Sequence, residues 1–336
     1  SRKGDYAGAQ PLYERALEAS ERVLGAEHPQ TLGSVNNLAY LLSRKGDYAG
    51  AQPLYERALE ASERVLGAEH PQTLGSVNNL AYLLESKGDY AGAQPLYERA
   101  LEARERVLGA EHPQTLLSVN NLAYLLESKG DYAGAQPLYE RALEARERVL
   151  GAEHPDTLGS VNNLAGLLES KGDYAGAQPL YERALEARER VLGAEHPQTL
   201  GSVNNLAYLL SRKGDYAGAQ PLYERALEGL LKVSAAMGGA HPNLQDFVGN
   251  YARCLEAMGK SQEEIRAILE GMLERYGMSM GDGGGGASSG QPSPQLLQVL
   301  QQLMQNPSSV QEIAEKLQRE DPALFAELMQ FLQSQR

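Results

Sequence analysis

The stretch LGAEHPQTLGSVNNLAYLL, residues 24–42, decides the fold, because it returns along the chain at a fixed period. A second copy begins at Leu66, and near-copies begin at Leu108, Leu150 and Leu192, each 42 residues after the last. Self-similarity at a period of roughly 20–50 residues is typical of proteins that stack one structural unit on the next. We therefore expect an extended array in place of the two or three ordinary domains that 336 residues would otherwise suggest.

The apolar residues of each unit follow the spacing of helices. Between Ala51 and Leu66 they recur every three, four or seven residues, which predicts an amphipathic helix of about 18 residues. The same spacing from Leu32 to Leu42 predicts a second, shorter helix, and Pro29 suits its first turn, where a missing N–H costs nothing. No window alternates with period two. The pattern predicts an all-α solenoid of antiparallel helix pairs, with about thirteen helices between residues 5 and 276.

Charge and composition exclude several classes of partner. The net charge of −13 argues against nucleic acid or an anionic membrane surface as the partner. The single cysteine, Cys254, excludes an internal disulfide and suits a reducing, cytoplasmic location. No stretch reaches the 18 or so apolar residues of a membrane span. The chain opens at Ser1 within what resembles the end of a helix, so we expect a fragment of a longer protein.

The pattern changes toward the C-terminus. Residues 1–276 are predicted to form the solenoid, and its last part, 239–276, keeps the His-Pro pair but alters most surface positions, as expected of a terminal capping pair. Residues 277–294 are rich in glycine and serine and are predicted to be a flexible linker. Residues 295–336 show three short amphipathic patterns, which predict a small helical module.

The histidine of each copy is the first candidate for chemistry. Equivalent positions on packed helices lie about 8–10 Å apart, whereas zinc ligands each lie about 2 Å from the ion, so successive copies cannot share a metal. No cysteine or second histidine accompanies any copy, and five near-identical turns provide no singular pocket for a partnered nucleophile. We expect the histidine to order the turn before the short helix. We predict no catalytic residue, metal or cofactor, and therefore no enzyme.

The run NLAYLLSRKGDYAGAQPLYERAL, residues 37–59, resembles the tetratricopeptide repeat. Its signature positions are occupied by Leu38, Ala39, Leu42, Gly46, Tyr48, Ala51, Tyr55 and Ala58. The period of 42, with its LGxxHP turn and NNLA, is similar to the longer repeats of the kinesin light chain type. This resemblance covers residues 1–276 and implies a right-handed superhelix whose short helices line a concave groove. In that family the groove holds extended peptides.

The differences between copies gather at positions that, by this resemblance, face the groove. Gly33 becomes Leu117 in the third copy, Tyr40 becomes Gly166 in the fourth, and Ser43-Arg44 becomes Glu-Ser in the middle three. Together with the first asparagine of each pair, these positions give the predicted peptide-binding residues: Asn36, Tyr40, Arg44, Asn78, Tyr82, Glu85, Leu117, Asn120, Tyr124, Glu127, Asn162, Glu169, Asn204, Tyr208 and Arg212. We expect the second asparagines, such as Asn79, Asn121 and Asn163, to lie nearer the seam between helices.

These features favour a non-catalytic scaffold that binds an extended segment of a protein partner. Amide side chains can pair with a peptide backbone of any sequence, and tyrosines add flat apolar surface with a polar tip. Two alternatives remain open. Residues 295–336 resemble the small modules of co-chaperones, which implies a chaperone or an exposed hydrophobic segment as partner, and the array could also be a purely structural spacer.

Overall fold

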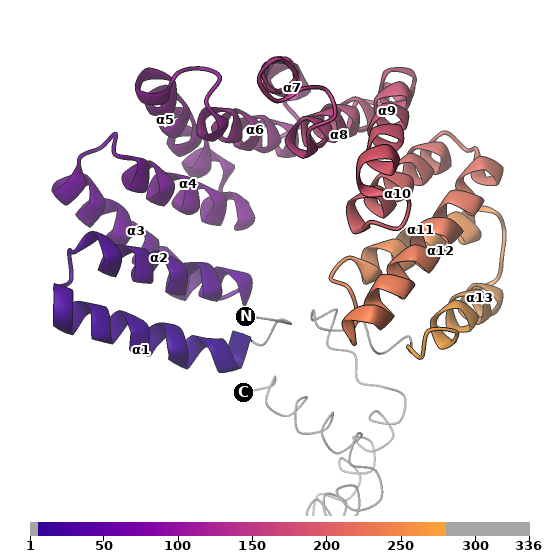
Figure 1. The fold of residues 1–336 in the computed structure, drawn as a ribbon, viewed down its shortest axis with the longest axis horizontal. Helices are drawn as coiled ribbons and strands as arrows, with labels where there is room; N and C mark the ends of the chain where they lie inside the picture. The colour runs from indigo at the N-terminus through magenta and orange to yellow at the C-terminus, as the bar shows by residue number, and fades with distance from the viewer. Residues whose placement is uncertain (1–5, 280–336) are drawn as a thin grey trace, which may run out of the picture. The chain divides into compact units, whose positions relative to one another are not determined.

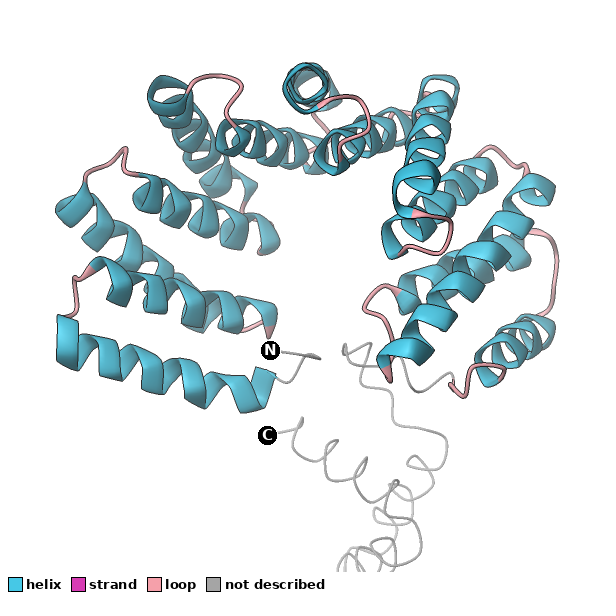
Figure 2. Ribbon diagram, viewed as in Figure 1, coloured by secondary structure: helices cyan, strands magenta, loops and turns pink. Residues whose placement is uncertain are grey.

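A computed structural model describes residues 6–279. Within that range thirteen helices follow one another and no strand forms, which confirms the predicted all-α array (Figures 1 and 2). The long helices are α1 (Tyr6–Leu24), α3 (Tyr48–Leu66), α5 (Tyr90–Leu108), α7 (Tyr132–Leu150), α9 (Tyr174–Leu192) and α11 (Tyr216–Met237). The short helices are α2 (Pro29–Arg44), α4 (Pro71–Ser86), α6 (Pro113–Ser128), α8 (Pro155–Ser170) and α10 (Pro197–Arg212), and α12 (Leu244–Ala257) and α13 (Gln262–Glu274) follow.

An aspartate fixes the start of each long helix from α3 to α11. The Asp47 carboxylate accepts the backbone N–H of Gly50 at 2.9 Å, and the same cap recurs 42, 84, 126 and 168 residues later. A Cβ atom on Gly50 would lie only 2.7 Å from Asp47 Oδ2, so the cap requires glycine at this position. The repeated DYAG motif is therefore a helix-start signal in which the aspartate caps the backbone N–H of the glycine.

A histidine and a proline fix the start of each short helix. Pro29 is the first residue of α2, and His28 Nδ1 accepts the N–H of Gln30 at 3.2 Å. The same bond forms at the four later copies, which confirms the predicted role of the histidine in ordering this turn. In the described range, no group of three or more His, Cys, Asp or Glu side chains is placed to hold a metal ion.

The core lies in the seams, by which we mean the buried layers between neighbouring helices. Each interior long helix packs against the short helix before it and the one after it, and in Figure 1 α7 lies outside α6 and α8. Val35, Ala39, Ala51 and Ala58 are completely buried, and Tyr55 is 2% exposed. The alanines let the helices approach closely, and the tyrosine fills the space between them, so each seam is packed like a protein interior.

Arginines and glutamates join successive long helices across the outer surface. Arg57 pairs with Glu21 and Arg99 with Glu63, and this pairing at a separation of 36 residues recurs as far as Arg225. A second series, which begins with Arg64 and Glu27 at a separation of 37 residues, joins each long helix to the turn that follows the preceding long helix. The paired side chains remain roughly a third to three-fifths exposed. We call these two series the ion-pair ladder.

The described range ends with α12 and α13, which fall inside the segment predicted as a capping pair. Ser261 and Glu264 form a reciprocal capping box at the start of α13, and Arg275 pairs with Glu228 of α11 at 3.1 Å. No helix in residues 6–279 is long and apolar enough to cross a bilayer. Nearly all of the predicted linker, 277–294, and all of the predicted module, 295–336, lie outside the described residues.

Candidate peptide-binding surface

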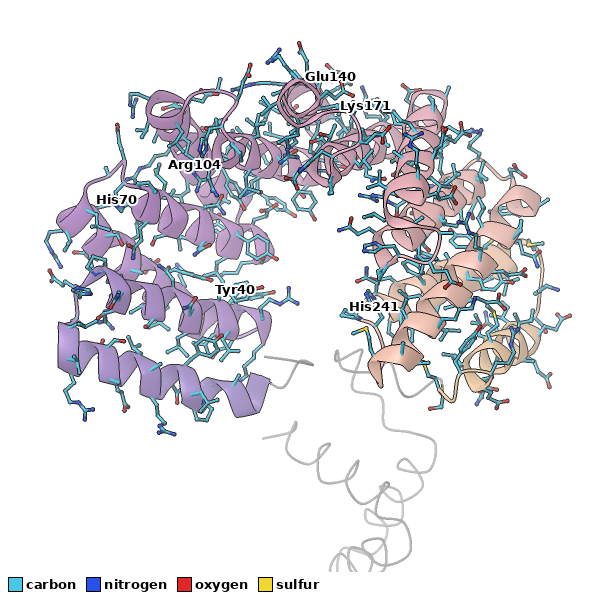
Figure 3. All side chains as sticks on the ribbon, viewed as in Figure 1. Tyr40, His70, Arg104, Glu140, Lys171 and His241 are labelled. Carbon is cyan, nitrogen blue, oxygen red and sulfur yellow. The ribbon has the colours of Figure 1, made fainter. Side chains whose placement is uncertain are left out.

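One face of every short helix stays accessible, and together these faces form what we call the inner stripe. Its residues follow the four-three-four spacing of a single helix face. They are Gly33, Asn37, Tyr40 and Arg44 on α2; Gly75, Asn79, Tyr82 and Ser86 on α4; Leu117, Asn121, Tyr124 and Ser128 on α6; Gly159, Asn163, Gly166 and Ser170 on α8; and Gly201, Asn205, Tyr208 and Arg212 on α10. Figure 3 shows Tyr40 on the side of α2 that faces the open centre of the curved array.

The predicted tyrosines and Leu117 all lie in the inner stripe. Tyr40 is 54% exposed, Tyr82 45%, Tyr124 57% and Leu117 42%. Leaving apolar side chains this exposed gains nothing for the fold, because the hydrophobic effect favours their removal from water. Their recurrence on successive helices forms a row of apolar surface with hydroxyl tips, the composition of many binding patches.

The first asparagine of each pair is partly or fully buried, and it is bonded to a neighbouring group. Asn120 nevertheless lines the hollow described below, and the second asparagine of each pair lies in the inner stripe. Asn36 Nδ2 donates to Ser76 Oγ of the next short helix at 3.0 Å, and Asn120 Nδ2 donates to the Leu116 carbonyl at 3.0 Å. Asn162 bonds within its own helix in the same way, Asn78 accepts a bond from Asn121, and Asn204 accepts one from Asn250. Each residue turns a helix by about 100°, so the two asparagines of a pair point in different directions.

The three predicted glutamates are also not free groove ligands. Glu85 and Glu169 are buried and Glu127 is half-buried, because each accepts a bond from a buried tyrosine of the following long helix. The hydroxyl groups of Tyr97, Tyr139 and Tyr181 donate to them at 2.7, 3.0 and 3.1 Å. Burial raises the pKa of Glu85 and of Glu169 above the ordinary value, and the tyrosine bonds oppose that rise. These carboxylates belong to the seam behind the stripe.

The two predicted arginines end the first and fifth short helices. Arg44 is exposed at the last residue of α2. The guanidinium carbon of Arg212 lies 5.9 Å from the ring centroid of Tyr208, a cation–π distance. Arg212 also donates to the hydroxyls of Tyr208 and Tyr174, at 3.3 and 3.4 Å, and these bonds raise its pKa. Tyr208 is therefore covered more than its counterparts on α2, α4 and α6.

A hollow of about 440 Å³ opens in the inner stripe between α6 and α8. From α6 it is lined by Leu117, Asn120, Asn121 and Tyr124, while Gly159 contributes no side chain from α8. Arg146 and Arg188 reach it from long helices. The hollow lies between the third copy, which has leucine at the position of Leu117, and the fourth, which has glycine there as the first, second and fifth copies do.

Sequence reasoning missed one set of arginines at this surface. Arg104, Arg146 and Arg188 stand where the first two units have Ser20 and Ser62. Arg104 is 5% exposed, and its Nη1 donates to Ser118 Oγ at 2.6 Å and to the Gln114 carbonyl at 3.3 Å.

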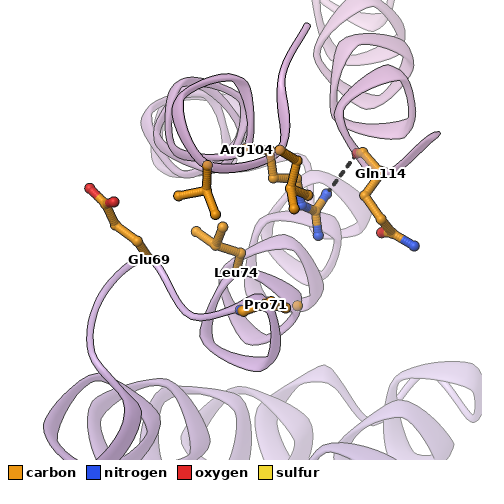
Figure 4. A pocket seen from close by; sticks show the side chains of 8 residues that line it. Glu69, Pro71, Leu74, Arg104 and Gln114 are labelled. Atoms are coloured by element: carbon orange, nitrogen blue, oxygen red, sulfur yellow. Dashed lines mark hydrogen bonds between the residues drawn. The ribbon is translucent and has the colours of Figure 1, made fainter. Parts of the chain in front are cut away.

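Figure 4 shows this arginine beside a smaller hollow of about 280 Å³ next to Leu74 and Pro71. Burial lowers the pKa of Arg104 and of its two counterparts. The change from serine to arginine was visible in the sequence, but an arginine on a charged helix is ordinarily read as surface.

Comparisons with known proteins give a consistent family. A model of the tetratricopeptide repeat matches residues 32–106, 74–148, 117–160 and 156–232, and a second tetratricopeptide model matches residues 1–30. The comparison with curated proteins found no match.

Solved structures agree with this match. One is a protein of Podosopora anserina, solved as a kinesin light chain with nearly identical TPR-like repeats. It is 29% identical to this chain, and the match covers 61% of this chain and 98% of that protein with a TM-score of 0.54. BtubC (BKLC) from P. vanneervenii is 27% identical over 71% of this chain and 94% of its own, with a TM-score of 0.58. The apo form of RapI, at 15% identity and a TM-score of 0.51, shares the fold, covering 76% of this chain and 92% of its own.

Proposed function

The chain belongs to the tetratricopeptide repeat family, with 42-residue repeats of the kinesin light chain type, and from that membership we propose that its inner stripe binds an extended segment of a partner protein. Tetratricopeptide arrays are protein-interaction scaffolds. The proposal adds which surface is used and what form the ligand takes. It describes a non-catalytic binding role.

The exposed row of tyrosines carries the proposal. Tyr40, Tyr82 and Tyr124 recur at one position of successive short helices, each about half exposed, while the seam residues around them are buried. An amide from Asn37, Asn79 or Asn121 lies three residues before each tyrosine on the same helix face. The stripe thus alternates flat apolar surface with groups that both donate and accept hydrogen bonds.

The dimensions favour an extended ligand. Neighbouring packed helices lie about 8–10 Å apart and an extended chain rises about 3.3 Å per residue, so one step between short helices spans about three peptide residues. A segment that crosses five short helices therefore needs about twelve residues. Its backbone groups would meet an asparagine at each step, and its side chains would contact the tyrosines and the hollow beside Leu117.

A selection from a randomised twelve-residue peptide library against the full chain tests the proposal. We expect binders whose affinity falls at least tenfold in the Tyr82→Ser, Tyr124→Ser double variant, because each lost aromatic contact costs about 1 kcal/mol or more. The matched control is Val107→Ser, Val149→Ser, which removes two half-exposed apolar side chains from long helices outside the stripe. Binders that lose affinity equally in both variants would show that the stripe is not the site, and an absence of binders would favour the structural spacer.

A further inference from the structure

Arg212 shows how the inner stripe holds a guanidinium group. It stacks on Tyr208 of its own helix and donates to Tyr174 at the start of the preceding long helix. Its positive charge also acts on Glu169 of the preceding short helix: burial raises the pKa of that carboxyl, and the Tyr181 bond and the charge of Arg212 oppose the rise. We call the three groups around Arg212, namely Glu169, Tyr174 and Tyr208, an arginine cradle.

The same cradle exists 84 residues earlier, but without its arginine. Glu85, Tyr90 and Tyr124 occupy the positions of Glu169, Tyr174 and Tyr208, whereas Ser128 stands in place of Arg212. The glutamate is held in the same way in both units, since Tyr97 donates a hydrogen bond to Glu85 as Tyr181 does to Glu169. The two tyrosines that contact a guanidinium in one unit, and the glutamate on which its charge acts, therefore have counterparts in another unit that supplies no arginine.

Two observations show that the earlier cradle lacks a partner. Glu85 is only 9% exposed, and its Oε1 is buried with no hydrogen-bond partner, although Oε2 accepts the Tyr97 bond. Tyr124 is 57% exposed, whereas Tyr208, under its arginine, is half-buried. A buried carboxylate oxygen without a donor is costly, so a ligand that supplies a donor would remove that cost.

The unit between these two is not equivalent. There Ser170 Oγ donates to Glu127 Oε1 at 3.2 Å, and Gly166 removes the aromatic ring. Its carboxylate already has a second donor, and it offers no ring on which a cation could stack. Of the three units with a glutamate at this position, only the one with Glu85 combines the complete cradle with a missing cation.

We propose that the cradle of Glu85, Tyr90 and Tyr124 binds the guanidinium group of an arginine side chain in the partner segment. This inference rests on the proposed function and narrows it, because it makes arginine the specificity residue of the ligand. A guanidinium suits the cradle better than an ammonium, since its plane stacks on the Tyr124 ring while its N–H groups reach the carboxylate.

The test uses two small probes with the full chain: N-acetyl-L-arginine amide and the uncharged isostere N-acetyl-L-citrulline amide. Tyrosine ring signals are followed by NMR and assigned with single Tyr→Phe variants. We expect saturable shifts at Tyr90 and Tyr124 with the arginine probe, and binding of the citrulline probe at least tenfold weaker. No saturable response at these two rings in the wild-type chain overturns the proposal.

Two variants make the test specific. Ser128→Arg places the chain's own arginine where Arg212 stands, so we expect it to fold normally and to lose the arginine response. Glu85→Gln keeps an acceptor for Tyr97 and should weaken the arginine probe at least tenfold. An unchanged arginine affinity in Ser128→Arg refutes the site. If library peptides bind but carry no preference for arginine, the cradle fails and the proposed function stands; if the probe binds and no peptide does, the assignment to a partner segment fails.

Discussion

Asn78 and Asn79 are neighbours in the sequence, yet they belong to different regions of the molecule. Asn78 lies in the seam, where its Oδ1 accepts a bond from Asn121 of the next short helix at 2.7 Å. Asn79 lies in the inner stripe, three residues before the exposed Tyr82. The comparison teaches that in a repeated array the seam determines whether units stack, while the stripe is free to vary from unit to unit. Changes in the two regions should therefore affect different measurements.

The largest effect is expected from Tyr97→Phe in the seam. The change leaves the buried Glu85 carboxylate without any hydrogen bond, which should lower the free energy of unfolding by about 3 kcal/mol at pH 7. Burial raises the pKa of Glu85 in the folded chain above the ordinary 4.5. The folded state therefore binds a proton at Glu85 more tightly than the unfolded state does.

The hydrogen bond from Tyr97 matters most to the charged carboxylate. The difference in free energy of unfolding between the wild type and Tyr97→Phe should therefore become smaller as the pH falls from 7 through that raised pKa toward 4.5. Urea unfolding at pH 7 and pH 5 measures both quantities. Tyr124→Phe, which alters an exposed ring of the stripe, is the control and should change stability by less than about 0.5 kcal/mol. A deficit for Tyr97→Phe that is constant with pH would contradict the assigned role of Glu85.

Replacing either of two glycines with alanine should change the stability of the chain in opposite directions. In Gly92→Ala the new Cβ would lie 2.7 Å from Asp89 Oδ2, so the cap of α5 breaks and stability falls by about 1 kcal/mol. Gly75 lies in the inner stripe with nothing within 4 Å of an added Cβ, so Gly75→Ala should stabilise the chain by about 0.5–1 kcal/mol through helix propensity. Urea midpoints of the two variants settle the comparison. Equal destabilisation would mean that the stripe is packed in a way the structure does not show.

The smallest effects test the two asparagines directly. Asn78→Ala leaves Asn121 without its acceptor and should lower stability by about 1 kcal/mol. Asn79→Ala should change stability by less than about 0.5 kcal/mol, but it should weaken a selected peptide about fivefold through the loss of one backbone contact. Thermal unfolding and peptide titration of both variants are sufficient. The reverse pattern would restore the original assignment of faces.

Periodicity was enough to predict the fold. The 42-residue period, the spacing of Leu32 to Leu42 and the His-Pro pair indicated two helices per unit and a histidine-ordered turn, and all of these are confirmed. Such features are local, since each depends on residues within one or two helical turns. Local sequence signals are therefore sufficient when each unit contacts only its neighbours.

The surface was predicted less completely, because it depends on how units meet. Tyr40, Tyr82, Tyr124 and Leu117 are accessible as predicted, although what they bind remains a proposal. The first asparagines and the glutamates were assigned to the groove, but Asn120 and Asn162 bond within their own helices, and tyrosines of the following long helices hold the glutamates. Arg104 was missed for the same reason, since its partners, Ser118 and Gln114, belong to the following helix.

The ion-pair ladder has a consequence for elasticity. Its two series of arginines and glutamates tie each long helix to the preceding long helix and to the turn after that helix, at exposed positions where attraction is screened by dissolved salt. The screening length falls from about 10 Å at 0.1 M salt to about 3 Å at 1 M, so rising ionic strength loosens these ties while the apolar seams hold. The resistance of the array to bending then depends partly on the salt concentration of the solution. Its bending would alter the distance between successive tyrosines, and with it the pitch of any segment that lies along them.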